Sequence, residues 1–251
     1  MHADAAGLPT LAVLLMTRVH KPAVPWALWR LVRGPAALKT VPGLRFARVL
    51  GSGRHGGFGL KPGLDCQGVF AMFDSLDAAE QFAQRSAVAA DYRSHAAESF
   101  TAVLRAISAR GSWAGQGMAA APDACVPAVP AVPGWPIAAL TRASIRPSKA
   151  LRFWRHSPPA EAELAQAPGC RLAVGLGEAP VLRQATFSVW DSQQAMDAYA
   201  RTGSHQRAIR ASYDGGYFSE SMFVRFAPVS ITGHWHGHRV AAGGDLVGAH
   251  V

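Results

Sequence analysis

The sequence predicts an α+β protein in which two tandem ferredoxin-like units, each ordered βαββαβ, form a pseudo-dimeric α/β barrel. The first observation is an internal repeat: Phe73–Ser75 (FDS) recurs as Trp190–Ser192 (WDS), each before a small-residue helix. A spacing of about 120 residues is too long for a solenoid repeat and suits a duplicated domain. The second is that strand-like and helix-like segments follow the same order in both halves. The third is a hydrophobic content of 49% in 251 residues, enough for a sizeable core.

The repeat extends along both halves of the chain. The other pairs are Thr17-Arg18 with Thr141-Arg142, Trp29-Arg30 with Trp154-Arg155, and Leu44–Phe46 with Cys170–Leu172. Each half alone would leave one apolar sheet face bare, and two halves can cover each other. We therefore expect an N-terminal unit at 8–110 and a C-terminal unit at 135–228.

The local patterns predict the elements of both units in order. Continuous or alternating apolar runs indicate strands, and a serine or aspartate before a periodic segment indicates a helix start. In the N-terminal unit these are strand Leu11–Val19, helix Pro25–Lys39, strands Leu44–Leu50 and Cys66–Phe73, and a helix capped by Asp74 or Ser75. In the C-terminal unit they are strand Ile137–Ile145, helix Phe153–Ala165, strands Arg171–Leu176 and Leu182–Trp190, helices Ser192–Arg201 and Ser204–Ser212, and strand Ser221–Phe226.

Two segments read as lying outside the units. Residues 111–134 are rich in Gly, Ala and Pro, which predicts an extended linker. Residues 229–251 are rich in His and Gly, which predicts a disordered tail. The tail includes His234, His236 and His238, but no cysteine or carboxylate supports a metal site there.

Composition excludes several functions. The net charge of +9 comes from dispersed arginines without a contiguous basic run, which disfavours nucleic-acid binding and favours anionic lipid or an acidic electron-transfer partner. Three cysteines without a C-x-x-C motif argue against a disulfide framework or an iron–sulfur cluster and indicate a reducing compartment. The apolar run Leu8–Val19 is too short to span a bilayer. We therefore expect no transmembrane segment and a cytoplasmic protein, with peripheral contact at the inner membrane.

His205 is the leading candidate for chemistry. It falls in the first turn of a predicted helix, where the helix dipole favours a neutral ring, and Ala208, Ile209 and Ser212 share its face. A neutral, inward-facing imidazole among small residues suits an axial iron ligand. A histidine here could equally hydrogen-bond the backbone. The first copy has Val88 at the matching position, so the repeat itself does not require a histidine.

Arginines near the predicted cofactor side are candidates for binding anionic groups. Arg152 and Arg155 flank two aromatic residues on one helical turn, and guanidinium groups pair with carboxylates or propionates. Arg142 lies near the end of a strand and could reach an anion or simply be solvated. No G-x-G-x-x-G opens a helix, and no G-x-S-x-G occurs, so nucleotide-binding and serine-hydrolase sites lack support.

The second half resembles the spheroidene monooxygenase family, the acyclic carotenoid 2-ketolases. The motifs are FWRH at 153–156, GLGEAP at 175–180, QATFSVWDS at 184–192, Ser204-His205 with Ala208-Ile209, and YFSESMFVRF at 217–226. The resemblance is dense over 138–227 and weaker from 11 to 107. It implies a haem-dependent monooxygenase that forms a C-2 ketone on carotenoids such as spheroidene by two hydroxylations and loss of water, using dioxygen and electrons from a ferredoxin-like donor. It also assigns the axial ligand to His205.

Two other hypotheses remain open from the residues. One is a cofactor-free binding or scaffold protein on the same duplicated barrel. The other is a cofactor-free oxygenase in which the histidine acts as a general base. The substrate could also be another apolar molecule.

Overall fold

The computed structural model describes residues 11–59, 61–120, 136–179 and 181–241, with only the backbone for residues 156–162, 165, 204 and 205. In the N-terminal unit the elements are β1 (Leu11–Val19), α1 (Val24–Arg33), β2 (Leu44–Gly53), β3 (Pro62–Phe73), α2 (Leu76–Arg85), α3 (Ala87–Ser94) and β4 (Ala96–Gly111). In the C-terminal unit they are β5 (Ile137–Ile145), α4 (Ala150–Ala165), β6 (Cys170–Ala179), β7 (Arg183–Trp190), α5 (Gln193–Ala200), α6 (Gly203–Asp214), β8 (Phe218–Trp235) and β9 (His238–Arg239). The predicted βαββαβ order is confirmed in both units, with the second helix of each divided in two.

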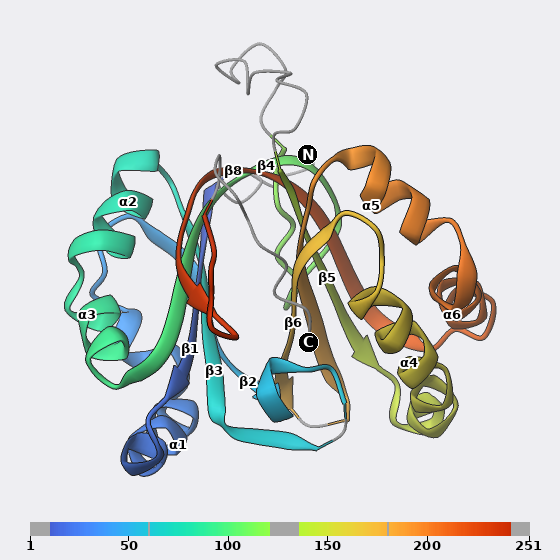
Figure 1. Cartoon of the computed structure of the whole chain (residues 1–251), viewed down its shortest axis with the longest axis horizontal. Coiled ribbons are helices and arrows are strands. Elements are labelled where there is room, and N and C mark those ends of the chain that lie inside the picture. The colour runs from blue at the N-terminus through green and yellow to red at the C-terminus, as the bar shows by residue number, and fades with distance from the viewer. Residues whose placement is uncertain (1–10, 60, 121–135, 180, 242–251) are drawn as a thin grey trace, which may run out of the picture.

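The strands form a closed barrel. Each unit contributes an antiparallel four-stranded sheet, ordered β4-β1-β3-β2 and β8-β5-β7-β6. The sheets join where β4 pairs with β8 and where Gly51 of β2 pairs with Gly177 of β6. In Figure 1 the helices lie outside the strands, α1 to α3 on one side and α4 to α6 on the other. The predicted pseudo-dimeric barrel is confirmed.

The duplication holds at the level of single hydrogen bonds. Asp74 and Asp191 each follow a central strand, and each forms an ion pair with the matching arginine, Arg45 or Arg171. Ser75 and Ser192 then cap the next helix by accepting a hydrogen bond from the backbone N–H three residues on. The repeated motif thus encodes one strand–turn–helix unit twice.

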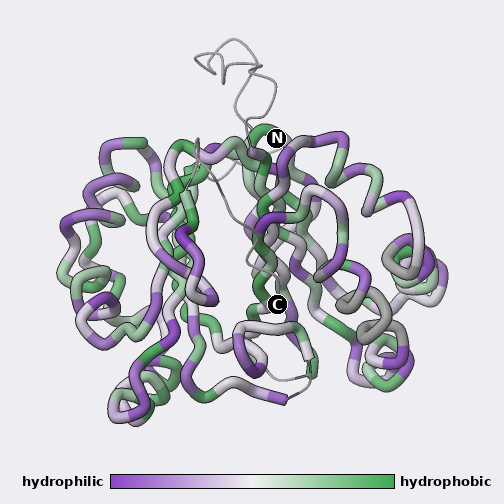
Figure 2. Tube along the Cα trace, in the orientation of Figure 1, coloured by the Kyte–Doolittle hydropathy of each residue, from purple (hydrophilic) through white to green (hydrophobic). Residues whose placement is uncertain are grey.

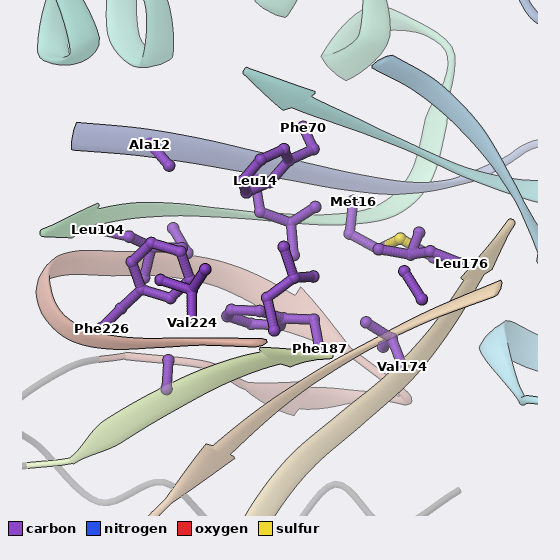
Figure 3. Packing of buried hydrophobic residues seen from close by; sticks show 14 of the residues in the cluster. Ala12, Leu14, Met16, Phe70, Leu104, Val174, Leu176, Phe187, Val224 and Phe226 are labelled. Atoms are coloured by element: carbon purple, nitrogen blue, oxygen red, sulfur yellow. The ribbon is translucent and has the colours of Figure 1, made fainter. Parts of the chain in front are cut away.

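The core has three parts because side chains alternate between the two faces of each strand. The inward faces fill the barrel, where Leu14, Phe70, Phe187 and Val224 meet from both units (Figure 3). The outward faces form two further clusters, each beneath the helices of one unit. Figure 2 shows apolar residues concentrated along the strands.

The predicted linker is wrong at its start. Residues 112–118 turn back into the barrel, with Trp113 bridged to Gln116 and its indole fully buried. That ring stacks on Phe70 at a centroid distance of 5.3 Å and meets Phe46 edge-on at 5.5 Å. The segment therefore adds an aromatic side chain to the barrel core. The rest of the predicted linker, from residue 121, lies outside the described residues.

The predicted disordered tail is also wrong at its start. β8 continues to Trp235, because it pairs with β4 as far as Gly233, and β9 folds back on it. Trp235 and Val240 are buried in the barrel cluster. Glu98 accepts hydrogen bonds from the backbone N–H groups of the tight turn between the two strands. Residues 242–251 lie outside the described part of the chain.

The helices that the structure describes are all too short or too polar to cross a bilayer.

Candidate functional site

The two halves differ most on the outward face of the sheet, beneath the helices. The β1–β3 and β5–β7 registers make Thr141 the structural counterpart of Leu15. The sequence repeat had paired Thr141 with Thr17, which is wrong by two residues. Leu15 is fully buried under its helices, whereas Thr141, at the same place in a central strand, is exposed. The C-terminal half therefore leaves space where the N-terminal half is filled.

The same change continues on β5, β7 and β8. Their side chains on this face are smaller or more polar in the C-terminal half. The counterparts are Val69 with Thr186, Ala71 with Ser188, Val13 with Ala139, and Val103 with Arg225. At Gly175 on β6, the counterpart of Val49, the backbone of Gly57 and Phe58 takes the place of a side chain. Replacing aliphatic groups by Ala, Thr and Ser removes side chains that would fill the layer. This helix-covered, trimmed sheet face is the candidate site.

The helices above that face are arranged to match. In the N-terminal half, α3 packs on α2 and also on the sheet strands β1 and β4. Its counterpart α6 packs chiefly against α4 and α5, and it exposes Ile209 and Tyr213. A helix that rests on other helices leaves room between itself and the sheet. Figure 1 shows α6 at the outer edge of the C-terminal unit, next to α4.

His205 lies in the first turn of α6. Gly203 begins this helix with a φ of 62°, and an added Cβ would lie 2.4 Å from the carboxylate of Glu163 on α4. Glycine at 203 therefore brings the start of α6 close to α4. The His205 side chain is outside the described residues, so its inward direction stays a prediction, as does its neutral state at the helix start.

Arg152 and Arg155 lie on α4, the helix against which α6 packs, and both are exposed. The aromatic residues between them anchor α4. Trp154 donates a hydrogen bond from Nε1 to the Val181 carbonyl at 2.8 Å, and Phe153 meets Phe218 edge-on. The structure thus places these two arginines on the helix next to His205.

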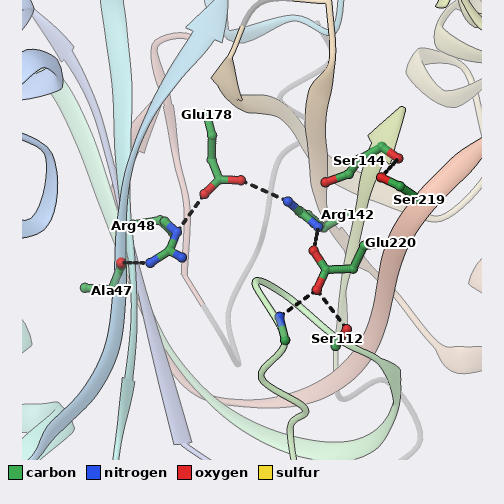
Figure 4. Close-up of polar contacts among 9 residues, drawn as sticks. Ala47, Arg48, Ser112, Arg142, Ser144, Glu178, Ser219 and Glu220 are labelled. Atoms are coloured by element: carbon green, nitrogen blue, oxygen red, sulfur yellow. Dashed lines mark hydrogen bonds and ion pairs between the residues drawn. The ribbon is translucent and has the colours of Figure 1, made fainter. Parts of the chain in front are cut away.

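Arg142 is separated from that group. Its side chain points into the barrel, on the other face of β5, and is 4% exposed. Its Nη2 donates to Glu178 at 3.1 Å, and its Nη1 donates to Glu220 (Figure 4). Its guanidinium lies 5.5 Å from the Trp113 ring. With both carboxylates engaged, Arg142 belongs to a buried ionic network and not to the helix-covered site.

The network continues on both sides of Arg142. Glu178 also accepts from Arg48 Nε at 2.6 Å, so positive and negative groups alternate across the barrel mouth. Burial raises the pKa of Glu220, but hydrogen bonds from Gly115 N–H, the Ser112 hydroxyl and Arg142 outweigh it and lower the pKa to about 2. The carboxylate therefore stays charged, and it ties the 112–115 turn to β8.

Sequence reasoning missed Arg225. Its Nη2 donates to Asp197 on α5 at 2.6 Å, and its buried Nε has no acceptor among the described residues. It occupies the position of Val103 on the trimmed face, so a charged donor lies within the candidate site. The available signal was a lone arginine inside the apolar run 222–226.

The histidine tract at 234–238 does not form a metal centre in the described structure. His234 lies on β8 and His238 on β9, and no group of three potential ligands gathers among the side chains that are described. Burial lowers the pKa of His236. These residues belong to the β8–β9 hairpin.

The chain is similar to known proteins over most of its length. It is 54% identical over 227 residues to a spheroidene monooxygenase of Rubrivivax gelatinosus, covering 90% of this chain and 85% of that protein. It is 31% identical to a spheroidene monooxygenase of Rhodobacter capsulatus, covering 92% and 94%. An aldoxime dehydratase crystallised with butyraldoxime shares the fold, with a TM-score of 0.54, 10% identity, and coverage of 90% and 81%. No family model matches the chain.

Proposed function

The chain belongs to the spheroidene monooxygenase family, and we propose that it is a haem-dependent monooxygenase that forms a C-2 ketone on acyclic carotenoids such as spheroidene. Two successive hydroxylations at one carbon, followed by loss of water, give that ketone. Electrons come from a reduced ferredoxin-like donor, and the protein meets its apolar substrate through peripheral contact with a membrane. The observation that carries the proposal is the trimmed sheet face beneath α6.

The residues present fit a haem at that face. The N-terminal half packs Leu15 and Val69 where the C-terminal half has Thr141 and Thr186, so a flat apolar ring has space in one half and none in the other. His205 on α6 would hold the haem iron. Arg152 or Arg155 on the adjacent α4 would pair with the propionates.

Haem iron supplies the binding and activation of dioxygen, which no protein side chain performs unaided. The chain's own residues bind, orient and exclude water. The helix layer and the sheet enclose an apolar substrate, and the buried Arg225 Nε offers a hydrogen-bond donor to an oxygen atom at the sheet face. Asp197 holds that guanidinium in place through the 2.6 Å hydrogen bond.

The test is the absorption spectrum of protein purified with a haem supply. Wild type is expected to show a Soret band, and His205→Ala is expected to lose it. His238→Ala, which changes an exposed histidine of β9, is the matched control and should keep the band. A Soret band unchanged in His205→Ala would remove that residue as the ligand.

A second variant tests the space itself. Thr141→Leu restores the side chain of the N-terminal half, so it should fill the layer, exclude haem, and leave thermal stability equal or higher. Haem retained at wild-type stoichiometry in a folded Thr141→Leu protein would place the group elsewhere. Conversion of spheroidene to a product with one added oxygen and two fewer hydrogens then tests the reaction.

A further inference from the structure

Helix α1 exposes apolar side chains to solvent and buries a charged one. Trp29 is 57% exposed and Val32 79%, and Leu28 on the same side is 40% exposed. These residues recur at the three-to-four spacing of one helix face. Arg30, in contrast, is 8% exposed, and its guanidinium lies 5.1 Å from the Tyr92 ring beneath the helix. An exposed apolar stripe of this kind marks an interaction surface.

The chain segment that carries the stripe has cations and no carboxylates. Residues 5–64 contain nine Lys and Arg residues and no Asp or Glu, whereas the rest of the chain contains sixteen of each. The exposed cations beside α1 are Lys21, Arg33 and Lys39. The Arg33 guanidinium lies 5.8 Å from the Trp29 ring, so a cation and the exposed indole share the surface. The whole net charge of the protein therefore originates in the segment that carries α1.

We propose that α1 binds the surface of an anionic lipid bilayer, with Leu28, Trp29 and Val32 entering the boundary between headgroups and acyl chains. Interfacial helices combine such an apolar face with a cationic border, and tryptophan favours the headgroup level. Lys21, Arg33 and Lys39 contact the anionic headgroups. Lipid is favoured over a protein partner because residues 5–64, the segment around the stripe, supply cations and no carboxylates, unlike the mixed charge of a specific protein interface.

This inference deepens the proposed function, since it rests on the peripheral membrane contact named there and assigns it to one helix. α1 and the α4–α6 layer lie on opposite sides of the barrel in Figure 1. Lipid binding can therefore be changed without altering the haem site.

The experiment is sedimentation of the full chain with vesicles of phosphatidylcholine, with or without phosphatidylglycerol, in the absence of substrate. We expect binding to the anionic vesicles that falls at least tenfold in Trp29→Ser/Val32→Ser. Lys21→Gln/Arg33→Gln/Lys39→Gln should lose about fivefold for each cation removed. Leu151→Ser, which changes an equally exposed leucine on α4, is the control and should bind as wild type does. Circular dichroism verifies that each variant is folded.

Three results would overturn the inference: equal binding to neutral and anionic vesicles, equal loss of binding in Leu151→Ser, or no vesicle binding together with a dimer that Trp29→Ser/Val32→Ser dissociates. The last would identify a second copy as the occupant of α1. Because neither haem nor turnover enters the measurement, failure here leaves the Soret test of the proposed function intact.

Discussion

Trp113→Ala is the sharpest test of the fold, because residues 111–134 look like a linker and yet Trp113 is fully buried. Truncating a buried tryptophan to alanine costs about 3–5 kcal/mol. Losing the contact with the Arg142 guanidinium, 5.5 Å away, adds about 1 kcal/mol. The indole N–H has no acceptor among the described residues, so removing this buried donor offsets about 1 kcal/mol of the lost stability. The expected net loss is about 3–5 kcal/mol.

The assay is urea and thermal unfolding of wild type and variants under identical conditions. For a chain of this size the loss corresponds to a decrease in melting temperature of about 6–20 °C. Trp29→Ala makes the same chemical change at a 57% exposed position and should cost less than about 0.5 kcal/mol. If Trp113→Ala lost no more than Trp29→Ala, the 112–118 turn would not be part of the core, and the linker interpretation would stand.

Three further predictions follow from the structure. The pKa of Glu220 is lowered to about 2, so the stabilisation from its carboxylate is present above pH 4.5, its ordinary pKa, and is lost as pH falls toward 2. Glu220→Gln should therefore reduce the slope of unfolding free energy against pH between 4.5 and 2 by the equivalent of about one proton. An unchanged slope would contradict this. Gly43→Ala and Gly169→Ala should each lower the free energy of unfolding in urea by about 2 kcal/mol, and Gly115→Ala by only about 1 kcal/mol. All three glycines have positive φ, but only at Gly43 and Gly169 would the added Cβ lie 2.7 Å from the Cβ of a helix alanine. Equal losses in the three variants would refute the argument. Ser192→Ala should lose about 1 kcal/mol with the cap of α5, and a negligible loss in thermal unfolding would deny the cap a role.

The sequence predicted the fold well because the signals that define it are local. The repeated Asp-Ser pair encodes a strand end, a turn and a helix cap, and the largely continuous apolar runs Leu11–Val19 and Ile137–Ile145 encode strands with two buried faces. The need of each sheet for a cover then determines the barrel. None of these inferences requires knowledge of distant contacts.

What the sequence could not predict depends on long-range geometry. Trp113 sits in a segment whose Gly and Ala content is typical of a linker, and only the barrel shows that its ring fills the space beside Phe70. Arg142 joins Glu178 and Glu220, residues 36 and 78 positions away, so its role could not be read from its neighbours in the chain. The Thr17–Thr141 pairing failed because identical short motifs say nothing of strand register.

The duplication explains how the C-terminal half could lose packing between its sheet and its helices without losing the fold. Closure of the barrel depends on the inward faces and on the β4–β8 and β2–β6 contacts, which both units share. The outward face of each unit affects only its own helix layer. Substitutions such as Leu15 to Thr141 therefore remove packing from one layer while the barrel and the other layer keep theirs. A ligand that fills the opened layer returns the lost stabilisation by binding only the folded state, so stability of the C-terminal half and occupancy of its site are coupled.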